Sequence, residues 1–263
     1  MNPRVAATLL LVPGVQHPTA VKKSALTLIR FLYIPPMCGR YSIAVVLELL
    51  RSRFELIGMT PEAADFVPRY NVAPTQDVPI VIGDNGNRLV TMRWGLVPSW
   101  AKEESIGNKM INARGETLTE KPSFRNLIDR SRVLVPIDGF YEWKVLPSGK
   151  KAPVRIRLKD HEPFGLAGLS DRWKKPDGSE LRTFTIITVE ANSHLRPVHD
   201  RMPAILSRDS EKPWLDMGLK AKDVLGLLKS YPAEEMEYYE VSSVVNSPRN
   251  DSPVCIEPVP QLL

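Results

Sequence analysis

Short stretches in which apolar and polar residues alternate dominate the chain after Met37. Residues 78–82 and 88–94 are rich in strand-forming residues and flank Gly83-Asp84-Asn85-Gly86, which predicts a hairpin. Residues 237–242 predict a late strand of the same kind. Five further segments between them also predict strands: 133–137, 140–144, 154–158, 164–169 and 184–189.

Helical patterns are fewer and shorter. Apolar residues recur at helical spacing over residues 44–56, and residues 123–130 predict a short helix capped by Ser123. Residues 209–230 predict two helical pieces with Pro213 near a boundary. Because strands and helices do not alternate regularly, we expect an α+β fold rather than a βαβ fold. Its mostly antiparallel sheets would curl around a core, with short helices at the flanks.

Composition divides the chain into three parts. Residues 1–36 are apolar and basic and contain no Asp or Glu, so we interpret them as a leader or as an extension before the true initiator Met37. Organelle targeting by this leader is the alternative. Residues 37–258 predict one domain, and residues 259–263 a tail. Without the leader the formal charge of +5 falls to 31 basic against 30 acidic residues. A nucleic-acid partner would therefore need a local basic groove.

Two cysteines, Cys38 and Cys255, are too few and too far apart for a disulfide framework or a common zinc site. They favour a reducing compartment, and we expect a cytoplasmic monomer, beside the nucleoid if the source is bacterial. Cys255 is expected to be buried. We expect no metal and no cofactor, and no apolar run reaches the roughly 18 residues of a membrane helix.

The segment Met37-Cys38-Gly39 carries the first candidate chemistry. Methionine aminopeptidases remove Met before a small residue, which would make Cys38 N-terminal. Its α-amine, with a reference pKa near 8, would form an imine with an aldehyde, and the thiolate would then close a thiazolidine ring. A thiol that attacks an amide, as in class II glutamine amidotransferases, is the alternative enzyme chemistry. An ordinary interior cysteine is the third interpretation.

Glu142 and His199 are candidates for proton transfer. Alternation places Glu142 on the same face of a strand as Phe140, with Tyr141 and Trp143 opposite. A carboxylate among aromatic residues suits proton transfer if its pKa is raised, whereas a solvated edge carboxylate is the commoner case. His199 titrates near neutrality, although a lone histidine is usually structural.

Further polar and aromatic residues could contact a nucleic-acid strand. Asn112 can orient a substrate, although it would equally serve as a helix cap. Arg114 and Arg201 suit phosphate. Three tryptophans and four arginines would form a stacking and phosphate groove for a single strand, although scattered Trp residues are more often core. They are Trp94, Trp100 and Trp143 with Arg40, Arg69, Arg93 and Arg172.

Six motifs in a fixed order give the chain a family resemblance. Over about residues 37–258 it resembles the SOS-response-associated peptidase domain, the family of abasic-site processing proteins. The motifs are Cys38-Gly39-Arg40-Tyr41 after Met, Tyr70-Asn71-Val72-Ala73-Pro74-Thr75, Trp94-Gly95-Leu96-Val97-Pro98, Asn112-Ala113-Arg114-Gly115-Glu116-Thr117, Gly139-Phe140-Tyr141-Glu142-Trp143 and His199-Asp200-Arg201-Met202-Pro203. The leader departs from the family pattern.

The resemblance implies a function and a set of residues. In that family the N-terminal Cys bonds the ring-opened aldehyde of an abasic site in single-stranded DNA as a stable thiazolidine, which shields the lesion. The resemblance assigns Cys38 as nucleophile, Glu142 and His199 as proton carriers, and Asn112 as the residue that positions Cys38 and the sugar. The implied DNA contacts are Arg40, Asn71, Pro74, Trp94, Arg114, Trp143 and Arg201.

The family name further implies a hydrolase that removes its own leader, and imine formation implies lyase-like Schiff-base chemistry. Two alternatives stay open. An N-terminal-Cys amidohydrolase would turn over glutamine. A non-covalent single-strand binding module would tolerate loss of Cys38, Glu142 and His199.

Replacement of Arg114 by Ala is expected to weaken DNA binding and to flatten its dependence on salt, because one phosphate contact and its released counterion are lost. Affinity for single-stranded DNA measured over a series of salt concentrations checks this. An unchanged slope would remove Arg114 from the phosphate contacts.

Overall fold

The computed structural model describes residues 39–260. Cys38, the leader 1–36 and the end of the tail, residues 261–263, lie outside the described residues. The expectations for the leader and for the tail's last residues therefore stay predictions.

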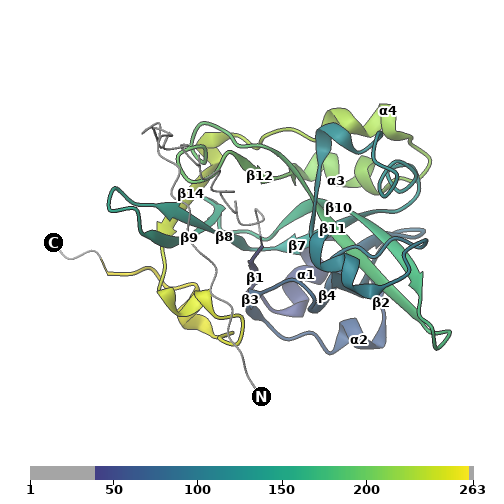
Figure 1. Ribbon diagram of the computed structural model, residues 1–263, viewed down its shortest axis with the longest axis horizontal. Helices are drawn as coiled ribbons and strands as arrows, with labels where there is room; N and C mark the ends of the chain where they lie inside the picture. The colour runs from purple at the N-terminus through teal and green to yellow at the C-terminus, as the bar shows by residue number, and fades with distance from the viewer. Residues whose placement is uncertain (1–38, 261–263) are drawn as a thin grey trace, which may run out of the picture. The chain divides into compact units, whose positions relative to one another are not determined.

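A five-stranded antiparallel sheet brings together the first strand and the last strand of the described chain (Figure 1). β1 lies between β8 and β3, so the start of the described chain is held on both sides. β8 and β9 pair antiparallel as neighbouring strands of this sheet. The strand order is β14 (Met236–Glu240), β9 (Lys151–Leu158), β8 (Gly139–Val145), β1 (Tyr41–Ile43) and β3 (Arg69–Val72).

A second, nine-stranded sheet curls so far that β5 and β11, which are not neighbours along its strand order, also pair with each other. β5 pairs in parallel with β11 at Trp94 and Phe184, which closes a ring through β10, β7 and β4. The fold is therefore α+β with largely antiparallel, curled sheets, as expected. The order is β12 (Arg201–Pro203), β11 (Glu180–Glu190), β10 (Phe164–Lys174), β7 (Arg132–Ile137), β4 (Asp77–Gly83), β5 (Asn87–Trp94) and β2 (Leu56–Met59), with β13 (Ile205–Leu206) on β10 and β6 (Asn112–Arg114) on β11.

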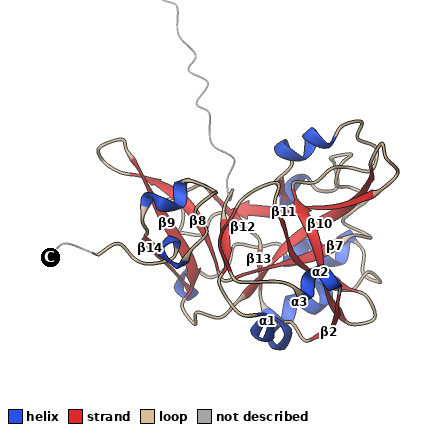
Figure 2. Cartoon of the chain, turned by 90° about the horizontal axis from the view of Figure 1, so that it is seen from below, coloured by secondary structure: helices blue, strands red, loops and turns tan. Residues whose placement is uncertain are grey.

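Short helices lie around the sheets (Figure 2). α3 packs on β7, and its Trp214 donates a hydrogen bond from Nε1 to the main-chain oxygen of Val133 over 2.9 Å. All six residues of β7 are buried as a result. The α-helices are α1 (Leu47–Arg53), α2 (Pro61–Ala64), α3 (Arg208–Leu215) and α4 (Ala221–Val224), and the 3₁₀ helices are η1 (Glu104–Lys109), η2 (Gly115–Thr117), η3 (Leu225–Leu227), η4 (Ala233–Glu235), η5 (Ser243–Asn246) and η6 (Pro253–Cys255).

The long predicted strands are confirmed, whereas two helix predictions need correction. The helix expected over 44–56 ends at Arg53, because Glu55 takes a positive φ of 50° and the chain then enters β2. Residues 123–130 form successive turns rather than a helix. Residues 209–230 contain two helical pieces, α3 and α4, as expected, and Pro213 lies in the last turn of α3, near its C-terminal boundary.

Trp94 connects the two sheets. Its ring is fully buried, with the ring of Tyr41 from β1 at 4.9 Å and that of Phe184 from β11 at 6.4 Å between centroids. Its Nε1 donates to the main-chain oxygen of Ile111, 2.9 Å away, directly before β6. The next residue, Gly95, has a φ of 115°, and a Cβ there would lie 2.7 Å from the oxygen of Gly107. The chain can therefore leave Trp94 in this direction only with glycine at position 95.

Between residues 39 and 260 the helices are all too short or too polar to cross a bilayer.

Replacement of Trp94 by Phe is expected to lower the free energy of unfolding by about 1–3 kcal/mol, because the oxygen of Ile111 keeps only the N–H of Ile186 as donor and the smaller ring leaves a cavity in the core. Chemical denaturation measures this change. The matched control is Trp100→Phe. The side chain of Trp100 is 59% exposed, so a change within about 0.5 kcal/mol is expected. Equal effects at the two positions would contradict the linking role of Trp94.

Candidate functional site

The first group of predicted site residues lies along β11. β6 pairs with β11 so that Asn112 faces Ile186 and Arg114 faces Thr188. β12, which begins at Arg201, pairs with the same part of β11 from its other side. Asn112 is therefore the first residue of a strand, and its interpretation as a helix cap is wrong.

Arg201 ties these segments together. Its Nη1 and Nη2 donate to the two carboxylate oxygens of Glu116 over 2.5 and 2.8 Å, and Nη2 also donates to the main-chain oxygen of Thr188 over 2.6 Å. The hydrogen bond from Arg201 holds the pKa of Glu116 below its ordinary value. A DNA phosphate would thus have to share this guanidinium with Glu116. The neighbouring Arg114 is exposed.

His199 lies in the loop before β12, with 17% of its side chain exposed. Its Nδ1 accepts the main-chain N–H of Arg201 over 3.0 Å and lies 2.8 Å from Oδ1 of Asp200. A neutral ring that accepts this N–H at Nδ1 carries its proton on Nε2, whereas the contact with Asp200 requires a hydrogen on Nδ1. Protonation of the ring would place a hydrogen on Nδ1, which Nδ1 could then donate to the carboxylate of Asp200. Burial lowers the pKa of His199, Asp200 opposes this, and the charges of Lys151 and Arg201 add to it.

The second group lies on the five-stranded sheet. Glu142 occupies the middle of β8 opposite Val154, and only 8% of it is exposed, so the solvated-edge interpretation is wrong. Phe140 packs into the main core while Tyr141 packs with Val245 and Cys255 in a separate small cluster. The alternation of faces predicted for this strand is thus confirmed, as is the burial of Cys255.

Arg40 leads into β1 beside this strand, and its main-chain oxygen accepts the N–H of Tyr141 over 2.9 Å. Its Nη1 donates to Oδ1 of Asn71 and to the oxygen of Val245, both over 2.8 Å. Within the described residues Arg40 forms no ion pair with a carboxylate. Burial lowers its pKa. A partly desolvated cation held by neutral acceptors favours the approach of an anion.

Two of the predicted DNA contacts point inward. Asn71 is fully buried, and its Nδ2 faces the main-chain oxygens of Val245, Ser247 and Asn250 at 3.1, 3.0 and 2.7 Å. Trp94 is equally buried. We therefore leave both out of the DNA-contact surface. Pro74 is half-buried in the loop after β3, so it stays in that set.

The two groups are brought near each other by separate elements. Trp94 packs on Tyr41 of β1 and bonds the residue before Asn112. Lys151 of β9 is near enough for its charge to lower the pKa of His199. Gly39, which directly follows Cys38 in sequence, lies two residues before β1. The position of Cys38 itself is not described.

Three polar residues that contact the predicted site residues were not predicted from the sequence. Glu116 and Asp200 stand inside motifs that were recognised, so the adjacency of Glu116 to Arg114 and of Asp200 to His199 was the available signal. Asn246, whose Oδ1 accepts the Nε1–H of Trp143 over 2.7 Å, gave no signal, because it lies far along the chain.

A cavity of about 920 Å³ lies elsewhere, between α3 and the β4–β5 hairpin. It contains Arg53 and Glu211, which form a bidentate ion pair with each other, and none of the predicted site residues lines it. Residues 39–260 contain no group of three or more His, Cys, Asp or Glu arranged to hold a metal.

The sequence profile of the SOS response associated peptidase (SRAP) family matches residues 37–248. This match covers most of the chain, so the protein belongs to that family.

Relatives and solved structures agree with this assignment. The chain is 48% identical over 223 residues to abasic site processing protein YoqW of Bacillus subtilis, covering 84% of this chain and 99% of that protein. It is 36% identical to abasic site processing protein HMCES of Xenopus tropicalis, covering 73% and 66% of the two chains. A crystal structure of a Bacteroides thetaiotaomicron protein superimposes with a TM-score of 0.77 at 30% identity, covering 84% of this chain and all of that one. The family of this chain is therefore one whose members process abasic sites in DNA.

The His199 ring is expected to titrate below its ordinary pKa of 6.5. Asp200→Asn should lower this pKa further, because the carboxylate stabilises the imidazolium, and Lys151→Met should raise it, because a like charge is removed. A pH titration followed by NMR of the ring Cε1–H checks both signs. If both variants moved the pKa of His199 in the same direction, the proposed effects of Asp200 and Lys151 on that ring would be contradicted.

Proposed function

We propose that this protein captures abasic sites in single-stranded DNA by a covalent bond to Cys38, once Cys38 is the N-terminal residue. The observation that carries the proposal is Arg40, which lies two residues after Cys38 in sequence and, among the described residues, is held by neutral acceptors without a carboxylate partner. It offers a phosphate site close in sequence to Cys38, and Glu142, the residue after its main-chain partner Tyr141 on β8, would supply the carboxylate for proton transfer. The names of the relatives, abasic site processing proteins, support the same substrate.

The chemistry takes two steps, one condensation and one ring closure. The α-amine of Cys38 adds to the aldehyde carbon of the ring-opened sugar, and loss of water gives an imine. The thiolate then attacks the imine carbon, and the nitrogen takes up a proton, which closes the thiazolidine. Glu142 would accept the ammonium proton and return one to the departing oxygen. His199 would serve the opening of the sugar through Nε2–H, because its Nδ1 is occupied by the main chain.

Contacts with DNA follow from exposure and charge. We assign phosphate contacts to Arg40 and Arg114 and a stacking face to Trp143, with Pro74 beside the strand. Arg201 contributes mainly by holding the turn of Glu116 against β11, so its phosphate contact is secondary. A single strand is the favoured substrate because no base pair has to be opened to present the lesion.

The residues before Cys38 have to be removed for this chemistry. For Met37 alone an aminopeptidase suffices, whereas a translated leader requires cleavage of the bond before Cys38. We propose that the protein performs this cleavage itself, with the Cys38 thiol as nucleophile. The intact mass of Cys38→Ala protein checks this step, since a leader still removed in that variant would point to another protease.

Cys38→Ala is expected to abolish adduct formation with single-stranded DNA that carries one abasic site, while non-covalent binding persists. Denaturing gels and intact mass, on protein that begins at residue 38, give the readout. Cys255→Ala is the matched control, because its thiol is buried in the cluster with Tyr141, and it should crosslink like the parent protein.

Adducts that survive Cys38→Ala would overturn the mechanism. Absence of an adduct from parent protein with a confirmed free Cys38 N-terminus would overturn the proposed function, and glutamine turnover would then be the next assay.

A further inference from the structure

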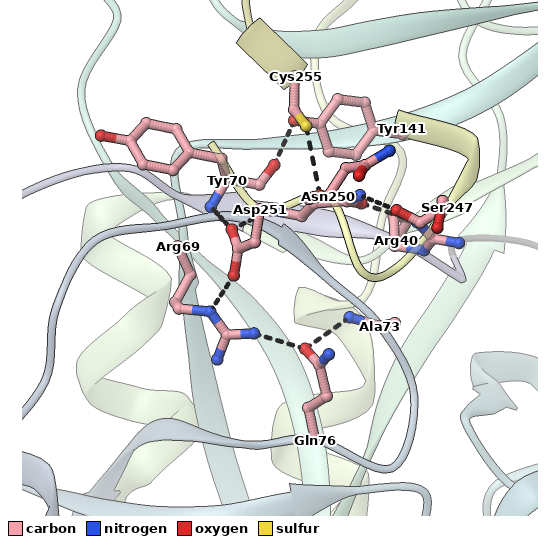
Figure 3. Close-up of polar contacts among 11 residues, drawn as sticks. Arg40, Arg69, Tyr70, Ala73, Gln76, Tyr141, Ser247, Asn250, Asp251 and Cys255 are labelled. Carbon is pink, nitrogen blue, oxygen red and sulfur yellow. Dashed lines mark hydrogen bonds and ion pairs between the residues drawn. The ribbon is translucent and has the colours of Figure 1, made fainter. Parts of the chain in front are cut away.

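The chain folds back late onto its first strands. Residues 243–255, here called the C-terminal segment, comprise η5 and η6 and lie against β3 (Figure 3). Asp251 anchors this segment. Its Oδ1 accepts the main-chain N–H groups of Tyr70 and Asn71 over 2.5 and 3.0 Å, and its Oδ2 pairs with Arg69.

A second anchor lies at the other end of the segment. Asn71 faces three of its main-chain oxygens, and Arg40 donates to the oxygen of Val245. Beside it, the hydroxyl of Tyr141 donates to the oxygen of Tyr70 over 2.6 Å, and the thiol of Cys255 to that of Asn250 over 3.4 Å (Figure 3). The segment is therefore fixed along its length by specific hydrogen bonds to β3, β8 and Arg40.

This arrangement holds Asn246 in contact with two of the proposed DNA contacts. Its Oδ1 accepts the indole N–H of Trp143 over 2.7 Å, and its main-chain oxygen lies 3.5 Å from Nη2 of Arg40. The guanidinium carbon of Arg40 lies 5.9 Å from the centre of the Trp143 ring. Asn246 is exposed and Trp143 is half-buried, so the ring lies at the surface.

We propose that Asn246 is a positioning residue for DNA binding, which fixes the indole of Trp143 beside the charge of Arg40. A base stacks on an aromatic face while its phosphate meets a cation, so a fixed spacing between the two groups suits one nucleotide. Without the acceptor at its edge, the indole is free to turn and must be ordered again when the strand binds. The inference rests on the proposed function in assigning DNA contact to Arg40 and Trp143.

A double-mutant cycle on the full domain tests this role, because it isolates the coupling between two residues. The variants are Asn246→Ala, Trp143→Phe and the double variant, and the probe is undamaged single-stranded DNA. Phe keeps an aromatic face but lacks the N–H that Asn246 accepts. Asn246→Ala is expected to weaken affinity about fivefold in the parent background, the size of one hydrogen bond, and less than twofold in the Trp143→Phe background.

Two further measurements distinguish a specific effect on the orientation of Trp143 from a general loss of order in η5. The Trp143 indole N–H resonance, assigned by its absence in Trp143→Phe, should move in Asn246→Ala before DNA is added. The matched control is Ser242→Ala, which removes the hydrogen bond from the main-chain N–H of Val244 at the start of η5 without touching Arg40 or Trp143. It should leave both the resonance and the affinity unchanged.

A fivefold loss that persists in the Trp143→Phe background, or no loss in the parent background, overturns the inference. Crosslinking to abasic DNA is followed in the same samples. The rate at saturating protein should stay the same in Asn246→Ala while the half-saturating concentration rises about fivefold. Failure of the parent protein to crosslink would overturn the proposed function, and the affinity cycle on undamaged DNA would still decide the role of Asn246.

Discussion

The buried indole of Trp94 is the contact on which the arrangement of the site depends. One side of the ring packs on Tyr41 in the five-stranded sheet, and its N–H fixes the main chain directly before Asn112 in the nine-stranded sheet. Each sheet carries only part of the proposed machinery. Arg40 and Glu142 belong to the first sheet, whereas Asn112 and His199 lie along β11. A fully buried side chain that forms both a packing contact and a hydrogen bond holds these parts at a defined distance. The side chains of a protein interior are close-packed, so the two sheets cannot move past each other without breaking these contacts.

The charges near the predicted site are mostly neutralised by ion pairs. Most arginines near the predicted site are paired: Arg69 with Asp251, Arg93 with Asp77 and Glu104, and Arg201 with Glu116. Arg40 differs, because it is bonded to an amide and main-chain oxygens only. A nearly neutral domain can therefore still offer a local positive site. The whole-chain charge, to which the leader contributes four basic residues, is a poor guide to it.

The sequence predicted the long strands because β4, β5, β10 and β11 contain runs of β-branched, aromatic and other apolar residues bounded by turn residues. The α+β class followed from the irregular order of strands and helices. It missed short strands such as β6 and β12, whose three residues are too few to show a period and which exist only because β11 offers them partners. The motifs identified the functional segments but not which side chains face outward. Asn71 and Trp94 illustrate this limit, because their burial is decided by the C-terminal segment and by Tyr41, which are distant in sequence.

The fold-back of the C-terminal segment onto β3 also has a consequence for the order in which a newly made chain becomes competent. The proposed nucleophile lies just before Arg40 in the chain, whereas the acceptors of Arg40 at Val245 and of Trp143 at Asn246 are made 205 and 103 residues after their partners. Until then the start of the chain lacks the neighbours that would hold a DNA strand against it. The proposed DNA-binding site is thus complete only after Asn246 has been synthesised and the C-terminal segment has folded back onto β3.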